Sequence, residues 1–151
     1  MRDEQLVTTD QAGKVSGIWL IIDKFSANPE RLFMVDGFGA LLTAFLLGVI
    51  LARFEDSFGM PQTILYFLSS VACIYSIYSF CCCFFVFSNW VPYLKAITIA
   101  NLIYCCLTIG LIFYFYQSLT FLGLIYFFLE IMVMIGLMLV ELMVILKKLK
   151  Q

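Results

Sequence analysis

The sequence contains no histidine, and charged residues fill only 13% of its 151 positions. Soluble domains carry about 25% charged residues, so this chain has too few to cover a surface that faces water. The missing imidazole also removes the commonest metal ligand in proteins and the usual axial ligand of haem. We therefore expect no metal and no cofactor, and the scattered basic residues argue against a nucleic-acid partner.

Cysteines are present, but none of the six stands in a CxxC pair. Most occur in runs, at Cys81 to Cys83 and at Cys105 and Cys106, whereas zinc sites and redox motifs need a fixed spacing. In an apolar stretch a cysteine behaves as a small hydrophobic residue. The sequence therefore predicts reduced cysteines. It also shows no nucleophile at a recognisable spacing from a base, so we do not expect an enzyme.

Hydrophobic residues make up 64% of the chain. They gather in four stretches, at 33–53, 61–87, 93–116 and 119–146. Each stretch reaches the roughly 20 apolar residues that a helix needs to cross a hydrocarbon core of about 30 Å. Proline is tolerated in the first turn of a helix, so Pro29, Pro61 and Pro92 mark helix starts, with Asn28 as a candidate cap.

The predicted fold is an all-α integral membrane protein, an antiparallel up-down-up-down bundle of four transmembrane helices with a short cytoplasmic N-terminal interfacial segment. The antiparallel order follows from the short connections, because these join neighbouring helices end to end. Residues 1–28 form the predicted polar and interfacial segment, and residues 29–151 the four-helix domain. The start does not resemble a signal peptide, so we expect the first span to be retained.

Within the N-terminal segment, residues 15–25 hold an apolar run that is too short to cross a bilayer. It suits a position among the lipid headgroups, and the alternative is that it folds over the cytoplasmic end of the bundle. Basic residues near the spans set the orientation. On one predicted side are Lys14, Lys24, Arg31, Lys95, Lys147, Lys148 and Lys150, and on the other is Arg53. We therefore expect a bacterial inner-membrane protein with cytoplasmic N and C termini.

Small side chains favour close helix packing in lipid, where the hydrophobic effect cannot hold helices together. The first stretch has a stripe of one acid and four small residues at every fourth position: Asp36, Ala40, Ala44, Gly48 and Ala52. The matching faces predicted for the next two helices are Ser69, Cys73 and Ser76, then Asn101, Cys105 and Thr108. Aromatic residues, including Trp90, are expected partly in belts at the membrane surface.

Three carboxylates fall within the predicted spans: Asp36, Glu130 and Glu141. A charge in hydrocarbon costs at least about 2.5–3.5 kcal/mol, so each is a candidate binding residue. Eleven helical steps separate Glu130 from Glu141, which places both on one face of the last helix. Asp36, Glu141 and Asn101 have similar predicted depths, so they could form one polar cluster. Together with Glu130, these residues are the candidates for binding a substrate or ion.

A structural role is the alternative for these acids. Glu130 would then stay protonated and hydrogen bond to a neighbouring helix, with Tyr75, Tyr104 and Tyr126 deep enough to provide a partner. Asp36 and Glu141 could also pair with Lys95 or Lys147 at the cytoplasmic interface.

Three segments carry a resemblance to known sequences: DGFGALLTAFLLGVILARFEDSFGMP (36–61), NLIYCCLTIGL (101–111) and GLIYFFLEI (123–131). Through them the chain resembles a group of small four-span hypothetical inner-membrane proteins of Bacteroidetes, with no established activity. The resemblance implies the topology and the bacterial location and carries over no functional residue. Small multidrug transporters are similar in size and span count, but their glutamate lies in the first helix.

We therefore expect the protein to transport or bind a cation, proton or small substrate at intramembrane carboxylates. The alternative is a non-transporting accessory or scaffold subunit of a membrane complex. The expected partners are the lipid bilayer and either further copies of the chain or a larger membrane complex.

Overall fold

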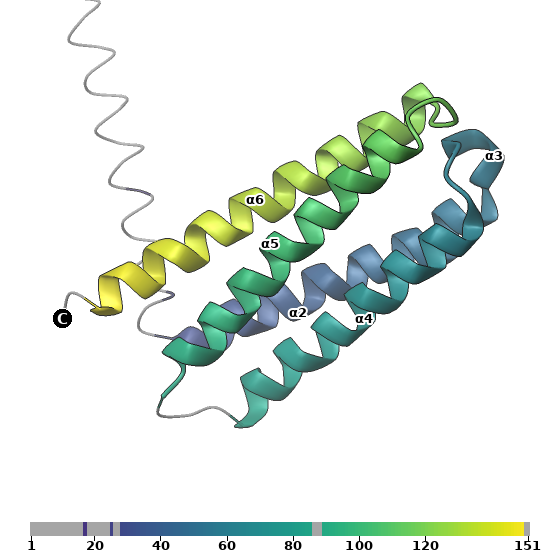
Figure 1. The fold of residues 1–151 in the computed structure, drawn as a ribbon. Coiled ribbons are helices and arrows are strands. Elements are labelled where there is room, and N and C mark those ends of the chain that lie inside the picture. Colours follow the sequence, from purple (N-terminus) through teal and green to yellow (C-terminus); the bar gives the residue numbers. More distant parts are fainter. Residues whose placement is uncertain (1–16, 18–24, 26–27, 86–88, 150–151) are drawn as a thin grey trace, which may run out of the picture.

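The computed structural model describes residues 17, 25, 28–85 and 89–149. Its elements are α2 (Pro29–Phe45), the π-helical segment η1 (Leu46–Leu51), α3 (Glu55–Phe58), α4 (Gln62–Phe85), α5 (Val91–Tyr114) and α6 (Phe121–Leu149). No strand occurs within these residues. Since η1 continues α2, four helices are long and apolar enough to cross a membrane, which confirms the all-helical prediction (Figure 1). The predicted interfacial run at 15–25 lies outside the described residues, except for Gly17 and Phe25.

The helix starts follow the prolines. Pro29 is the first residue of α2, Pro61 directly precedes α4, and Pro92 is the second residue of α5. Asn28 occupies the cap position of α2, yet within the described part of the chain its side chain makes no capping hydrogen bond. The predicted stretches match the observed helices to within a few residues, and the largest difference is the earlier start of the first helix.

The helices form two closely packed pairs, α2 with α4 and α5 with α6 (Figure 1). Serine hydroxyls join the first pair: Ser69 donates to the Ala44 carbonyl at 2.8 Å, and Ser76 donates to the Gly37 carbonyl at 2.9 Å. Cys73, predicted on the same face, is exposed. That prediction was wrong because the buried face of α4 runs through Leu68, Ala72, Ser76 and Ser79, one helical position away from Cys73.

The stripe of small residues on the first helix lies partly inside the bundle. Ala44 and Ala52 are buried, whereas Ala40 and Gly48 are half-buried. A Cβ atom at Gly48 would lie 2.5 Å from Oγ of Ser69, so a larger residue would displace the Ser69 hydroxyl or the helices themselves. Gly48 belongs to the π-helical turn η1, whose wider winding rotates the following residues relative to a regular α-helix.

Hydrophobic side chains close the bundle near both ends. One cluster combines residues of all four helices with Trp90: Leu32, Phe33, Cys82, Cys83, Leu94, Ile97, Val144 and Ile145. Phe25 packs against it. The second cluster lies toward α3 and contains Leu47, Leu51, Ala52, Met60, Leu65, Leu68, Tyr104 and Phe127. Trp90 was predicted in a belt at the membrane surface, but it is buried. It packs among the helices in the first cluster.

The α3 end is held by contacts between the two loops there. The Thr120 amide donates to the Phe58 carbonyl at 3.2 Å, and the Thr120 hydroxyl donates to the Ser57 carbonyl at 2.6 Å. The same hydroxyl accepts the Gly123 amide at 3.2 Å and so caps α6. Gly59 has a φ of 74°, and any side chain there would collide with the loop at Ser118. These contacts tie the α2–α4 pair to the α5–α6 pair.

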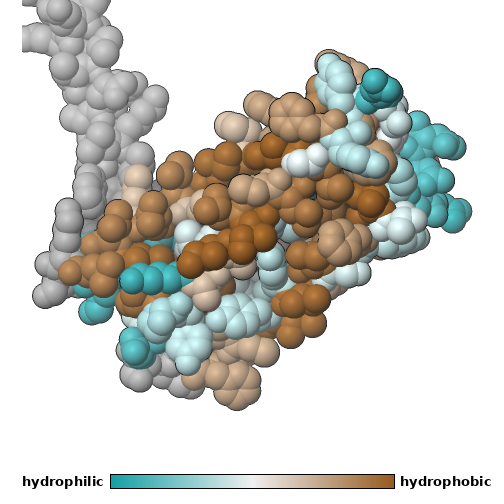
Figure 2. All heavy atoms as spheres, viewed as in Figure 1, coloured by the Kyte–Doolittle hydropathy of each residue, from teal (hydrophilic) through white to brown (hydrophobic). Residues whose placement is uncertain are grey.

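The outer surface of the bundle is apolar. Bulky exposed side chains occur on every long helix, among them Phe38, Phe67, Ile74, Ile103, Phe113, Phe128 and Val133. In Figure 2, hydrophobic residues extend along the helices, and the most hydrophilic ones lie at the two ends, with the larger group at the α3 end. Soluble monomers rarely expose apolar patches of more than a few hundred Å², so the surface suggests a multi-pass membrane protein.

Candidate functional site

A cavity of about 260 Å³ lies between the two helix pairs. Its walls are contributed by Gly39, Ala40, Leu42, Thr43 and Leu46 of the first helix, by Ala72 and Tyr75 of α4, and by Leu129, Val133, Met134 and Leu137 of α6. Five further residues supply most of its polar groups: Asp36, Asn101, Tyr104, Tyr126 and Glu130. An apolar chamber with a few polar groups is the usual form of a small-molecule site.

The cavity reaches the outer surface between α2 and α6. Leu42 is 59% exposed, Leu129 62% and Val133 65%, although all three also line the cavity. Their side chains therefore stand at its rim. The two hydrophobic clusters lie toward the ends of the bundle, so the opening faces the apolar flank of the bundle.

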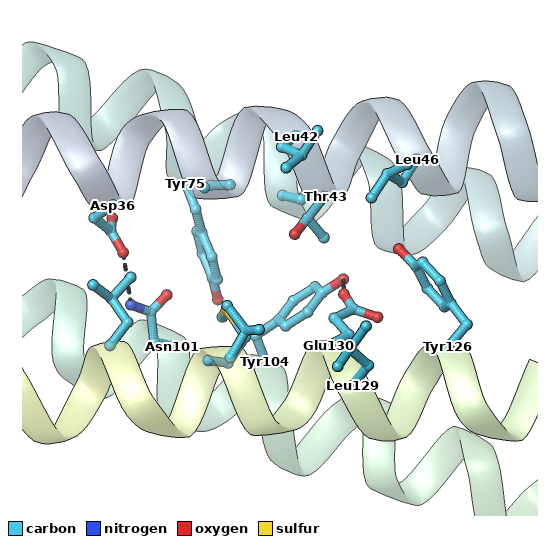
Figure 3. Close-up of a pocket in the computed structure, with 16 residues that line it drawn as sticks. Asp36, Leu42, Thr43, Leu46, Tyr75, Asn101, Tyr104, Tyr126, Leu129 and Glu130 are labelled. Atoms are coloured by element: carbon cyan, nitrogen blue, oxygen red, sulfur yellow. Dashed lines mark hydrogen bonds between the residues drawn. The ribbon is translucent and has the colours of Figure 1, made fainter.

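Glu130 projects into this cavity from α6. Its Oε1 accepts a hydrogen bond of 3.0 Å from the Tyr104 hydroxyl on α5 (Figure 3). Only 9% of the residue is exposed, and among the described residues no group hydrogen bonds to Oε2. The sequence left open which deep tyrosine would partner Glu130, and Tyr104 is that partner. Tyr126 extends from α6 toward α2 next to Glu130 (Figure 3).

Asp36 lies at the other end of the cavity and is bound by neutral side chains. The Asn101 amide of α5 donates to Oδ1 at 2.9 Å, and the Ser79 hydroxyl of α4 makes a short hydrogen bond to Oδ2. Asp36 is thus buried between three helices with both carboxyl oxygens occupied.

Glu141 completes this polar cluster from α6. It is fully buried, and its Oε2 accepts the Thr98 hydroxyl at 2.9 Å. Its carboxyl group is also close enough to Asp36 and Asn101 to interact with both electrostatically. All four long helices therefore contribute a polar side chain to one layer of the bundle.

The structure thus brings three of the candidates, Asp36, Asn101 and Glu141, into one cluster, with Glu130 further along the same cavity. Of the packing residues, Ala40 also lines the cavity. The sequence did not single out Ser79 or Thr98 as hydrogen-bond donors to the buried carboxyl groups. Serine and threonine are common in apolar helices, where most hydrogen bond to their own backbone, so their presence carried no distinguishing signal.

Within the described residues, no group of three or more histidine, cysteine or acidic side chains could hold a metal ion. All six cysteines are free thiols. Compared with protein-family models, with curated proteins and with solved structures, the chain shows no match. Its function is therefore inferred from the geometry of the cavity and of the polar cluster.

Proposed function

We propose that the chain crosses a lipid bilayer as an antiparallel up-down-up-down bundle. The four helices have 23 to 29 residues, which is enough for a hydrocarbon core of about 30 Å. Apolar outer surfaces and short connections support the same arrangement.

The proposed location is a bacterial inner membrane with both termini in the cytoplasm. The start of α2 and the end of α6 lie at one end of the bundle (Figure 1). Lys95, Lys147 and Lys148 belong to helix ends on that side, whereas Arg53 precedes α3 at the opposite end. An excess of basic residues on the cytoplasmic side of short loops supports this orientation.

The proposed function is to bind a small cation in the cavity and move it across the membrane. The observation that carries this proposal is the buried Oε2 of Glu130, which belongs to a cavity-lining residue and has no hydrogen-bond partner among the described residues. A carboxylate in an apolar environment is stabilised strongly by a nearby positive charge. Glu130 would therefore neutralise the charge of the ligand.

The other walls indicate the kind of cation. Tyr75, Tyr104 and Tyr126 line the same cavity, and aromatic faces attract cations with apolar substituents. Dry apolar cavities of about 150 Å³ already hold benzene, so a volume of 260 Å³ accommodates a small organic cation. A bare proton would satisfy Glu130 without filling the space, which favours the larger ligand.

The test uses purified protein in lipid nanodiscs and an aromatic quaternary ammonium ion as probe. A neutral isostere, with carbon in place of the charged nitrogen, is the control ligand. We expect the cation to bind and the isostere to bind at least about tenfold more weakly, a difference of about 1.4 kcal/mol. Glu130→Gln should remove the preference for the cation.

Asp56→Asn is the matched control variant, because it removes an exposed carboxylate in α3. It should bind the probe like the unaltered protein. Equal binding of cation and isostere to the unaltered protein would refute the proposed function. If neither binds and a stable partner protein copurifies under gentle detergent conditions, the accessory or scaffold role is the better account.

A further inference from the structure

The Asp36 carboxyl group of α2 and the Glu141 carboxyl group of α6 are both buried and close enough to interact electrostatically. These two helices otherwise touch little, because the cavity lies between them. The carboxyl pair is therefore one of the few direct links between them.

The hydrogen bonds around the pair are unequal. Asp36 has a partner on each oxygen, Asn101 on Oδ1 and Ser79 on Oδ2. Glu141 has Thr98 on Oε2, but within the described part of the chain nothing hydrogen bonds to its buried Oε1. The Thr98 hydroxyl has one proton and two acceptors, Oε2 and the Leu94 carbonyl at 3.0 Å, so Glu141 is the less well satisfied acid.

Two ionised carboxylates are both acceptors and repel each other, whereas a protonated carboxyl group donates a hydrogen bond to an ionised one. A proton on Oε1 of Glu141 would give this buried oxygen a donor function and Asp36 a third hydrogen-bond partner. Further neighbours within the described ranges are Cys82 of α4, which is close enough to interact electrostatically with Asp36, and the neutral Thr98 and Asn101 of α5.

We propose that the Asp36–Glu141 pair is a binding site for one proton, which Glu141 carries and shares with Asp36. The bound proton links α2 to α6 beside the cavity. When the pair releases this proton, two negative charges face each other across the gap and push the helices apart. Because Asp36 and Asn101 also line the cavity, this movement changes its shape at the end away from Glu130.

The proton site deepens the proposed function, and its role in transport rests on that function. Proton release at the pair would favour opening of the cavity between α2 and α6, so movement of the cation would depend on the proton. The proton site itself follows from the polar cluster and does not depend on the identity of the cation.

Infrared spectroscopy of the full-length protein in nanodiscs tests the site, since a protonated carboxyl group has a C=O stretching band that shifts in D₂O. We expect a band from Glu141 that is lost as the pH rises. Glu141→Gln should lack this band at every pH, because the substituted amide can donate to Asp36 but has no carboxyl group to titrate. Asp56→Asn should leave the band unchanged.

A second variant covers the case in which Glu141→Gln does not fold. Thr98→Val keeps the shape of the side chain and the acid but removes the hydroxyl partner of Oε2. It should shift the frequency of the same band and its pH midpoint.

If the spectra of the unaltered protein and of Glu141→Gln do not differ in the carboxyl region at any pH, or if Thr98→Val leaves the Glu141 band unmoved, the proton site is overturned. The same holds if the unaltered protein shows no such band at any pH. Binding of the ammonium probe is measured separately. A failure of the proposed cation site at Glu130 can therefore be distinguished from a failure of the proposed proton site at Asp36 and Glu141.

Discussion

Tyr104 on α5 and Glu130 on α6 are joined by a hydrogen bond of 3.0 Å from the phenol to Oε1 of the carboxyl group. The bond leaves Oε2 of Glu130 buried beside the cavity. Tyr104 thus fixes the orientation of the acid, while the other oxygen stays available to a ligand.

Tyr104→Phe should therefore weaken probe binding. The ring would remain, but Glu130 would lose its donor and the ionised form would be less well stabilised. We expect about tenfold weaker binding of the ammonium probe and a loss of about 1–2 kcal/mol in the free energy of unfolding. Tyr75→Phe is the control, since Tyr75 lines the same cavity on α4. An equal effect of both substitutions would contradict the role assigned to Tyr104.

Gly48→Ala should destabilise the packing of the first helix against α4. The added Cβ would lie 2.5 Å from Oγ of Ser69, so either the Ser69 hydroxyl must turn away and lose its bond to Ala44 or the helices must separate, at a cost of about 1–3 kcal/mol. Gly39→Ala is the control because a Cβ there has no neighbour within 4 Å among the described residues. Unfolding in mixed micelles measures both variants, and a Gly39→Ala protein that is as unstable as Gly48→Ala would disprove this packing.

Ser76→Ala should cost more stability than Ser70→Ala. The Ser76 hydroxyl is buried and bonds across to Gly37 at 2.9 Å, whereas the exposed Ser70 hydroxyl bonds within its own helix to Tyr66. Interhelical hydrogen bonds in membranes contribute about 0.6 kcal/mol on average and up to about 1.7 kcal/mol. The same unfolding measurement should place Ser76→Ala in this range and Ser70→Ala near zero. A reversed order would show that the two helices do not pack through Ser76.

Thr120→Ala should loosen the connection between the two helix pairs at the α3 end. It removes the cap of α6 and the hydrogen bond to the Ser57 carbonyl. Loss of a threonine cap costs about 1 kcal/mol, and the loop at 57–59 should become more accessible to protease. Thr63→Ala, at an exposed position of α4, is the control. Identical protease sensitivity of both variants would exclude the loop contact.

The sequence predicted the helices well because length, apolar content and the three prolines determine them locally. It also identified the buried acids, since a carboxylate in an apolar stretch stands out. The prediction that Asn101, Cys105 and Thr108 share a buried face of α5 is confirmed.

The rotation of each helix and its exact partners depend on tertiary packing, which local patterns do not determine. Cys73 was wrongly placed inside because its neighbour Ala72 faces the core instead. The π-helical turn at Leu46–Leu51 leaves no sequence signal that separates it from an α-helix. The cavity is lined by residues of all four long helices, so it could not be predicted from any one helix.

The most direct test of cation binding is chemical labelling of Glu130 from the lipid phase. A membrane-permeant carbodiimide modifies protonated carboxyl groups, and a buried acid without a nearby cation is expected to be neutral. Peptide mass spectrometry should find Glu130 modified in the unliganded protein and protected by a saturating concentration of the ammonium probe, but not by its neutral isostere. If Glu130 is modified and the cation protects it no better than the isostere, the protein does not bind a cation at this carboxyl group.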